Sequence, residues 1–410
     1  MMQTAPHKHF DVVVVGAGMV GLSLVAALAP LNLKIAIVDQ SAPTEKNTWQ
    51  GRDPRVSAIV KSSEQFLKKC GAWDFISQER HCSFYGMDVW EQDGTANIQF
   101  DAADVAEQNL GYIVENRVMQ WALQQSINKH KNISWFCPEK ISELKRNTHW
   151  QLYFASGTQI EGALLIGADG AESFVRKSLN MDVVIKDLGH HAIVCNVQTE
   201  KPHQGIARQI FLNSGPLAFL PLEKNEAKIA NNNYCSIVWS LTPEKAKAMM
   251  ALNENEFNQK LTGHFEYRLG EVISSDKRFS FPLFQRHAKS YIADGVALIG
   301  DAAHTIHPLA GQGVNLGYMD AQALAEEIER AIGRKISISS REVLRRFERK
   351  RRGENTLMMQ SMRVFQNLYA TNNPDLRLLR NWGLNITNKS TLIKNLFLKQ
   401  AMGISRDISL

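Results

Sequence analysis

A chain of 410 residues exceeds the usual size of one domain, and a content of 44% hydrophobic and 21% charged residues excludes general disorder. The net charge of +6 is uneven, because residues 334–410 carry 16 Lys and Arg against 5 Asp and Glu. No basic module with interleaved aromatic residues is visible in the sequence, so we expect no nucleic acid among the partners.

The N-terminal segment has the pattern of one βαβ unit. Residues 10–15 (FDVVVV) form a β-branched apolar run, which is typical of a strand buried on both faces of a parallel sheet. Residues 19–28 have helical apolar spacing, and residues 34–38 (KIAIV) predict the second strand.

A glycine-rich turn joins the first strand to the helix. Gly16, Gly18 and Gly21 match the dinucleotide-binding fingerprint, in which the first glycine permits the turn and the second lets a pyrophosphate approach the backbone. The third lets the helix pack closely, so that the phosphates meet free N–H groups at the helix N-terminus. Asp39 ends the second strand, where a carboxylate can accept hydrogen bonds from ribose hydroxyls.

Similar short strands recur at residues 163–166 and 296–299, whereas residues 207–239 alternate as antiparallel strands do. We therefore predict an α/β fold in which a Rossmann-like nucleotide-binding domain carries an inserted antiparallel β-sheet substrate domain and a helical C-terminal tail. The nucleotide-binding domain is expected to comprise residues 1–81, 110–182 and 284–333, the substrate domain residues 82–109 and 183–283, and the basic helical region residues 334–410. The fingerprint alone does not separate NAD from FAD.

A second motif, GDAAHTIHPLAGQGVNLG, occupies residues 300–317. Asp301 follows a strand, where it could accept hydrogen bonds from a polyol such as the ribityl chain of a flavin. The turn leads into a helix predicted at 314–332, whose dipole would stabilise a reduced flavin ring by about 0.3–2 kcal/mol. His304 and His307 have the spacing of metal ligands, but Pro308 interrupts the turn and no third ligand is near, so we favour a structural or flavin-side role and expect no metal.

The second motif resembles that of the aromatic-ring hydroxylases with a para-hydroxybenzoate-hydroxylase-like fold, and Gly167–Gly170 (GADG) resembles their intervening motif. This resemblance implies an FAD cofactor, so that the Rossmann-like domain is expected to be an FAD-binding domain, with Asp169 serving both FAD and NAD(P)H. It also implies O2 as a substrate, NAD(P)H or another electron donor, and oxygen transfer through a flavin C4a-hydroperoxide. We expect the backbone of Pro308, Gly311, Gln312 and Gly313 to form the reactive face.

Within that family the chain is most similar to the ubiquinone-biosynthesis hydroxylases. The segments 53–59 (DPRVSAI) and 115–120 (ENRVMQ) resemble those of this group, which implies that Arg55 and Arg117 contact the flavin. Gly313 and Asn315 are expected to bind the cofactor as well. The segment 207–241 is similar to the subgroup acting on polyprenylphenols, although residues 224–233 are longer and more polar than that pattern.

We therefore expect an FAD-dependent monooxygenase that hydroxylates the aromatic ring of a hydrophobic polyprenylphenol. Open alternatives are a later benzoquinol or another phenol as substrate, a flavin oxidase or dehydrogenase, and a flavin-containing subunit that assembles a ubiquinone-biosynthesis complex. The sequence has no apolar run of the roughly 18–20 residues that span a membrane and no signal peptide, and its five cysteines lack paired spacing. A cytoplasmic protein is expected, and the apolar and basic spacing after residue 376 suits either peripheral contact with the inner membrane face or packing on the protein's own core.

Overall fold

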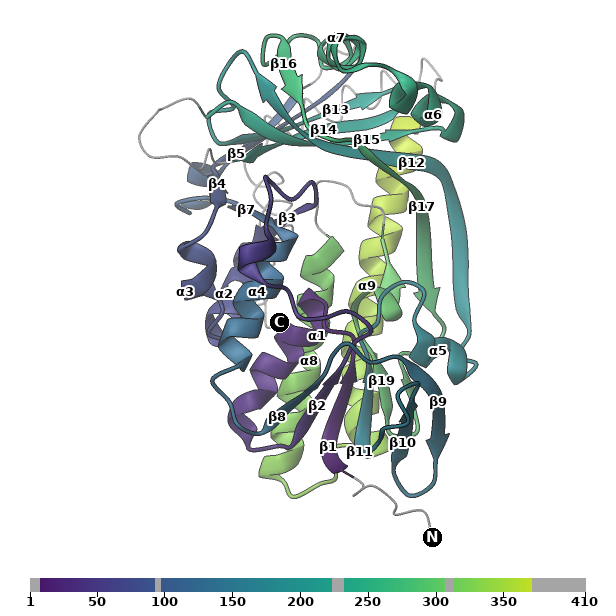
Figure 1. The fold of residues 1–410 in the computed structure, drawn as a ribbon. Coiled ribbons are helices and arrows are strands. Elements are labelled where there is room, and N and C mark those ends of the chain that lie inside the picture. The colour runs from purple at the N-terminus through teal and green to yellow at the C-terminus, as the bar shows by residue number, and fades with distance from the viewer. Residues whose placement is uncertain (1–7, 93–96, 223–231, 307–312, 371–410) are drawn as a thin grey trace.

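In the computed structural model, the described residues are 8–92, 97–222, 232–306 and 313–370. Their strands form three sheets, with a mixed sheet at one end of the molecule and a larger, mostly antiparallel sheet at the other (Figure 1). This arrangement confirms the predicted α/β fold with an antiparallel sheet. The division of the chain into domains at the stated residues stays a prediction, and residues 371–410 lie outside the described part.

The first sheet, here called the nucleotide sheet, contains the predicted strands of the βαβ unit. Its strands are β1 (Lys8–Val15), β2 (Ile35–Val38), β8 (Ile133–Phe136), β9 (Ile141–Arg146), β10 (Trp150–Phe154), β11 (Gln159–Gly167), β18 (Ile292–Ala293) and β19 (Val296–Leu298). The main order is β18-β19-β11-β1-β2-β8, while β10 pairs with β11 and β9 with β10. The strands predicted at 163–166 and 296–299 correspond to the end of β11 and to β19.

β1 lies in the interior of the sheet, and its buried side chains on both faces are apolar. Val12, Val13 and Val14 are fully buried, and β1 is parallel to β11 on one side and to β2 on the other. The chain therefore proceeds from β1 towards β2 but later returns to the other side of β1. Such a reversal creates a crevice at the carboxyl end of the strand, which is where ligands of open α/β sheets bind.

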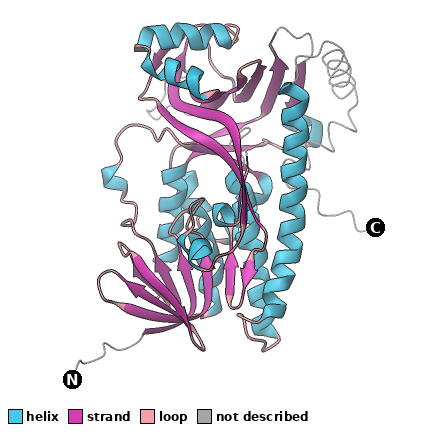
Figure 2. Ribbon diagram, turned by 90° about the vertical axis from the view of Figure 1, so that its right-hand side faces the viewer, coloured by secondary structure: helices cyan, strands magenta, loops and turns pink. Residues whose placement is uncertain are grey.

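Most helices lie around the nucleotide sheet, whereas α6 (Pro243–Ala251) and α7 (Glu254–His264) pack on the larger sheet. The other helices are α1 (Met19–Leu28), α2 (Lys61–Lys69), α3 (Trp73–Ser77), α4 (Asn116–Ile127), α5 (Phe174–Ser178), α8 (Gly313–Gly333) and α9 (Arg341–Ala370). α1 packs against α4 and α8, and α9 packs against α8. Figure 2 shows α9 running along the molecule from the nucleotide sheet towards the other end. No helix in the described part of the chain is both long enough and apolar enough to cross a bilayer.

The segments of the large sheet interrupt the nucleotide strands in the sequence. Its strands are β5 (Gly86–Glu91), β6 (Asn97–Asp101), β12 (Val183–Thr199), β13 (Ile206–Leu212), β14 (Gly215–Leu222), β15 (Tyr234–Leu241), β16 (Val272–Ser275), β17 (Phe279–Ala288) and β20 (His304–Thr305). The order is β20-β17-β12-β15-β14-β13-β5-β6, and β16 pairs with β12. One face packs on α6 and α7 around Trp239 and Phe257, so the opposite face points towards the nucleotide sheet (Figure 1).

A small three-stranded sheet lies between these layers. Its strands are β3 (Val56–Val60), β4 (His81–Phe84) and β7 (Gly111–Glu115). Ala58 and Ile113 of this sheet pack with Leu220 of β14 in one apolar cluster. β17 makes a second connection, because its first residues pair with β12 in the large sheet and its far end pairs with β20, which begins three residues after Asp301. The antiparallel sheet is thereby held against the loops that follow the nucleotide strands.

Candidate functional site

The glycine turn after β1 has the geometry that the fingerprint predicts. Gly16 has a φ of +112°, and a Cβ there would lie 2.3 Å from the carbonyl oxygen of Ala168. A Cβ on Gly21 would lie 2.1 Å from the Gly16 oxygen. Both glycines are therefore required by close packing inside the protein, the first in the turn and the third between helix and strand.

Gly18 differs from the other two glycines, because a Cβ built on it meets no atom within 4 Å. It is the N-cap of α1 and provides no side-chain hydrogen bond, and the first turn of α1 holds no acidic residue. The N–H groups of the first turn therefore form the positive end of the helix dipole, beside the open space at Gly18. This is a cradle that fits the pyrophosphate of a dinucleotide.

Asp39 lies beside the glycine turn, at the end of β2. Its Oδ2 accepts a hydrogen bond from the Ala17 N–H at 2.7 Å, and its Oδ1 accepts one from the Ser41 N–H at 2.8 Å. The carboxylate therefore shapes the turn itself. It is also at the place expected for a ribose contact, and that role stays a prediction.

Val20 brings the two distant motifs together. A Cβ on Gly317 of α8 would lie 2.4 Å from a Val20 methyl carbon, and one on Gly300 would lie 3.2 Å from another. Gly300 also has a φ of +58°. The first turn of α1 thus fits against two glycines of the second motif, and this contact places Asp301 near the glycine turn.

Asp301 is exposed to solvent, yet protein surrounds it closely enough for desolvation to raise the pKa of its carboxyl. His304 and Arg286 partly offset that increase electrostatically. The buried Arg176 holds the backbone next to Asp301, because it donates hydrogen bonds to the carbonyl oxygens of Ala302 and Ala171, each at 2.7 Å. An accessible carboxylate on a clamped backbone is suited to accept hydrogen bonds from a polyol.

A buried ionic network behind Asp301 was not predicted from the sequence. Asp320 of α8 accepts hydrogen bonds from His304 Nε2 at 2.5 Å, Arg351 Nε at 2.7 Å and the Gly300 N–H at 3.0 Å. Burial would raise the pKa of Asp320, but His304 and Arg351 hold it well below its ordinary value. Asn355 of α9 donates to the same carboxylate at 3.2 Å. The network joins the second motif to α8 and α9.

One signal for this network was present in the sequence. Asp320 lies four residues after Leu316 and four before Leu324, in the stripe that helical periodicity assigns to the buried face of α8. A carboxylate there requires a cationic partner. The identity of that partner, Arg351, depends on the packing of α9 and could not be read from spacing. His304, for which the sequence favours a structural or flavin-side role, contacts Asp320, and the choice between the two roles stays a prediction. His307 lies outside the described residues.

Asp169 stabilises the N-terminus of the short helix α5, whose N-cap is Ser173. Its Oδ1 accepts a hydrogen bond from Ser173 Oγ at 2.5 Å, and its Oδ2 accepts one from the Val175 N–H at 3.0 Å. The preceding Ala168 is the residue that contacts Gly16. The intervening motif is therefore next to the glycine turn, and a direct contact of Asp169 with FAD or NAD(P)H stays a prediction.

Arg117 belongs to a second ionic group, centred on the buried Glu115. Glu115 pairs with Arg117 Nη2 at 2.7 Å and with Arg80 Nε at 2.9 Å, and it accepts a hydrogen bond from the Asp53 N–H at 2.9 Å. The Arg117 guanidinium also lies over the Trp49 ring, 5.0 Å from its centroid. Arg55 is exposed, at the start of β3. The predicted flavin contacts of both arginines are not tested by these interactions.

The remaining predicted site residues surround the start of α8. Asn315 is buried, donates from Nδ2 to the Ala58 oxygen at 2.8 Å, and accepts from the Val60 N–H at 3.3 Å, so it ties α8 to β3. Gly313 begins α8 in open space. The other predicted reactive-face residues, Pro308, Gly311 and Gln312, lie outside the described residues.

An apolar surface lies at the edge of the large sheet. Strand pairing places Phe281 opposite Ala192 and Phe279 opposite Val194, on the face that points away from α6 and α7. Phe279 and Phe281 keep 40% and 38% of their surfaces exposed. Arg286, five residues further along β17, pairs with Thr305, so this apolar surface lies about 16 Å along one strand from the second motif.

Comparisons with known proteins agree with this arrangement. A family model described as an FAD binding domain matches residues 9–360. The chain is 35% identical to the 3-demethoxyubiquinol 3-hydroxylase of Escherichia coli (strain K12), covering 96% of this chain and 98% of that protein. It is 32% identical to the mitochondrial ubiquinone biosynthesis monooxygenase COQ6 of Drosophila melanogaster, covering 98% and 91%, respectively.

Solved structures show the same fold. The p-nitrophenol 4-monooxygenase PnpA from Pseudomonas putida DLL-E4 matches with a TM-score of 0.77 at 18% identity, covering 98% of this chain and all of that chain. PqsL of P. aeruginosa, solved with 2-aminobenzoylacetate, matches with a TM-score of 0.75 at 18% identity, covering 92% of this chain and 100% of that one. At this identity the similarity concerns the architecture.

Proposed function

The chain belongs to the FAD-dependent monooxygenases of ubiquinone biosynthesis, and on that basis we propose that it hydroxylates the aromatic ring of a hydrophobic polyprenylphenol. One observation carries the proposal. The cradle at Gly18 and the accessible Asp301 are held together by Val20, and β17 connects them to an exposed apolar surface. A dinucleotide site joined to an apolar surface suits a redox enzyme with a lipophilic substrate.

Each part of the FAD has candidate partners in this chain. The N–H groups of the first turn of α1 would hold the pyrophosphate, Asp39 the adenosine ribose, and Asp301 the ribityl chain. Arg55, Arg117, Asp169, Gly313 and Asn315 are proposed as further contacts. Bound FAD would supply the activation of O2 with electrons from NAD(P)H or another donor. The protein's contribution would be orientation, a fixed electrostatic environment and the exclusion of water by the apolar surface.

Labelled oxygen tests the reaction class directly. The purified flavin-containing enzyme would be given a polyprenylphenol, a suitable reductant and 18O2, and the product would be analysed by mass spectrometry. We expect one labelled oxygen atom in the ring hydroxyl. An oxidised product without label would show a flavin oxidase or dehydrogenase instead, and hydroxylation of a later benzoquinol alone would correct the substrate.

The exposed phenylalanines of β17 make the substrate prediction specific. Phe281→Ser is expected to raise KM for a long-chain polyprenylphenol about tenfold with little change in kcat, because it removes apolar contact area worth roughly 1.5 kcal/mol. A phenol without the chain should show a much smaller change. Ile273→Ser on β16, which also alters an exposed apolar side chain of the large sheet, serves as the control. Equal effects on the long-chain and chain-free substrates would contradict this assignment.

A surface of α9 supports contact with an anionic membrane, where a polyprenylated substrate would reside. Arg341, Arg345, Arg349 and Arg352 recur at helical spacing on α9, and all are exposed. Such a row of cations is attracted to acidic lipids. The enzyme is expected to sediment with vesicles containing acidic lipids at low salt but not with neutral vesicles. Charge reversal of Arg345 and Arg349 to Glu should abolish the difference, and its persistence would contradict a role for α9.

A further inference from the structure

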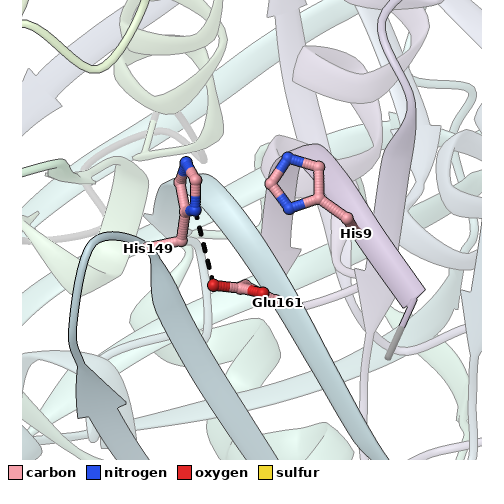
Figure 3. Close-up of side chains that lie close together, drawn as sticks. All are labelled: His9, His149 and Glu161. Carbon is pink, nitrogen blue, oxygen red and sulfur yellow. Dashed lines mark ion pairs between the residues drawn. The ribbon is translucent and has the colours of Figure 1, made fainter. Parts of the chain in front are cut away.

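Three side chains with metal-ligating groups converge at the end of the nucleotide sheet opposite the glycine turn. They are His9 of β1, His149 immediately before β10, and Glu161 of β11 (Figure 3). His9 lies seven residues before Gly16, which corresponds to about 23 Å along an extended strand. The cluster is therefore separate from the proposed flavin site.

Strand pairing brings these residues together. His9 is directly paired with Glu161 in the parallel β1–β11 ladder, and Gln151 of β10 is paired with Glu161 on its other side. Trp150, next to His149, is buried and donates a hydrogen bond to the Asp294 oxygen at 3.2 Å. The sheet backbone thus fixes the positions of His9 and Glu161, and His149 lies in the turn directly before the paired Trp150.

The ligand atoms of the three residues are close enough together for one small cation to bind all of them. One ligand atom from each residue lies within 4.8 Å of the others, and His149 Nδ1 is 3.4 Å from Glu161 Oε1. Two ligands of a tetrahedral zinc ion, each about 2.0–2.1 Å from the metal, are separated by about 3.3–3.4 Å. The His149–Glu161 pair already has this separation. The ring of His9 lies 4.8 Å from that of His149 between centroids, so a small rotation would bring it to the same spacing.

The charge of the cluster also suits a divalent cation. Two imidazoles and one carboxylate form a donor set used by zinc, which accepts a water molecule as its fourth ligand. The neighbouring Lys8 does not compete for the carboxylate, because strand alternation turns it to the opposite face and its Nζ lies over the Phe136 ring at 5.7 Å from the centroid. His9 is exposed, which leaves a path for the ion.

We propose that His9, His149 and Glu161 bind one Zn²⁺ ion with water in the open position. The ion joins β1, β11 and the start of β10 at an end of the sheet where Glu161 and His149 otherwise make a single contact of modest strength. Bound there, the ion holds the β9–β10 hairpin to the central strands. Because the ion binds the folded chain and not the unfolded one, it raises the melting temperature of the protein.

The proposal is tested by calorimetric titration of ZnCl2 into the full-length, flavin-containing protein, purified without a polyhistidine tag and treated with chelator. We expect one Zn²⁺ per chain and a higher melting temperature in its presence. His149→Asn and Glu161→Gln should each weaken binding by about tenfold or more. His130→Asn alters a histidine in the turn between α4 and β8 and should bind Zn²⁺ as the unaltered protein does.

Flavin absorbance reports folding in every variant, since the cluster is remote from the glycine turn. If His149→Asn loses its flavin, the nearly isosteric Glu161→Gln decides the result. Absence of saturable binding by the unaltered protein would overturn the proposal. Equal affinity in the unaltered protein, His149→Asn and Glu161→Gln would do so too, because the ion would then be bound elsewhere.

Discussion

Asp320→Asn is expected to reduce the free energy of unfolding by about 3–5 kcal/mol, because it leaves the buried cation of Arg351 without its principal partner. Both side chains are completely buried. Glu354 still contacts Arg351, but its side chain is 43% exposed and replaces little of the lost interaction. The asparagine also cannot accept from His304, Arg351 and the Gly300 N–H as a carboxylate does, so the Asp301 segment should loosen and the affinity for FAD should fall.

Urea unfolding of the flavin-depleted protein measures the first effect, and flavin titration measures the second. Asp294→Asn is a matched control, because Asp294 pairs with Arg146 at 2.9 Å while 81% exposed. An exposed pair of this kind contributes about 0–1 kcal/mol. If the two substitutions lowered the free energy of unfolding equally, the buried network would contribute no more to stability than an exposed ion pair.

Gly18→Asp is expected to weaken FAD binding by about 100-fold or more without destabilising the flavin-depleted protein. The position has ordinary extended backbone, with φ of −75° and ψ of 175°, and the added side chain meets no protein atom within 4 Å of its Cβ. Aspartate is a better N-cap than glycine, so α1 should not suffer. Its charge would occupy the cradle, where repulsion of a phosphate about 4 Å away costs up to roughly 4 kcal/mol.

Gly18→Asn separates charge from size, since the two side chains have nearly the same volume. Fluorescence titration of the flavin-depleted variants should show a clearly smaller loss of affinity for the asparagine variant. Equal losses would assign the effect to steric exclusion alone. Undiminished FAD affinity in the aspartate variant would place the pyrophosphate elsewhere and remove the basis of the proposed cofactor site.

The sequence predicts the strands and helices whose residue patterns lie within a short stretch of the chain. The run of valines before Gly16 is typical of a doubly buried strand and forms β1, and the predicted helices at 19–28 and 314–332 agree with α1 and α8. The alternation of polar and bulky residues could predict that antiparallel strands are present. Their order could not be predicted, because β5 pairs with β13 across a separation that no turn residue encodes.

The same distinction applies to the site. Gly16, Gly18, Gly21 and Asp39 are close in sequence, and their common location followed from one fingerprint. The partnership of Asp320 with Arg351, the clamp of Arg176 on Ala302 and the pairing of Glu115 with Arg80 join elements far apart in the chain. An arginine is usually solvated, so nothing in its sequence neighbourhood distinguishes one that is completely buried.

The position of Val20 between Gly300 and Gly317 has a consequence for synthesis of the protein. A ribosome has made about three quarters of the 410 residues before either glycine exists. Until then α1 lacks α8, one of the two helices that it packs against, and the emerging chain presents apolar surface of the kind that chaperones protect. The contact between the two motifs, and with it the proposed FAD site, can therefore form only late in synthesis, once the second motif has been added.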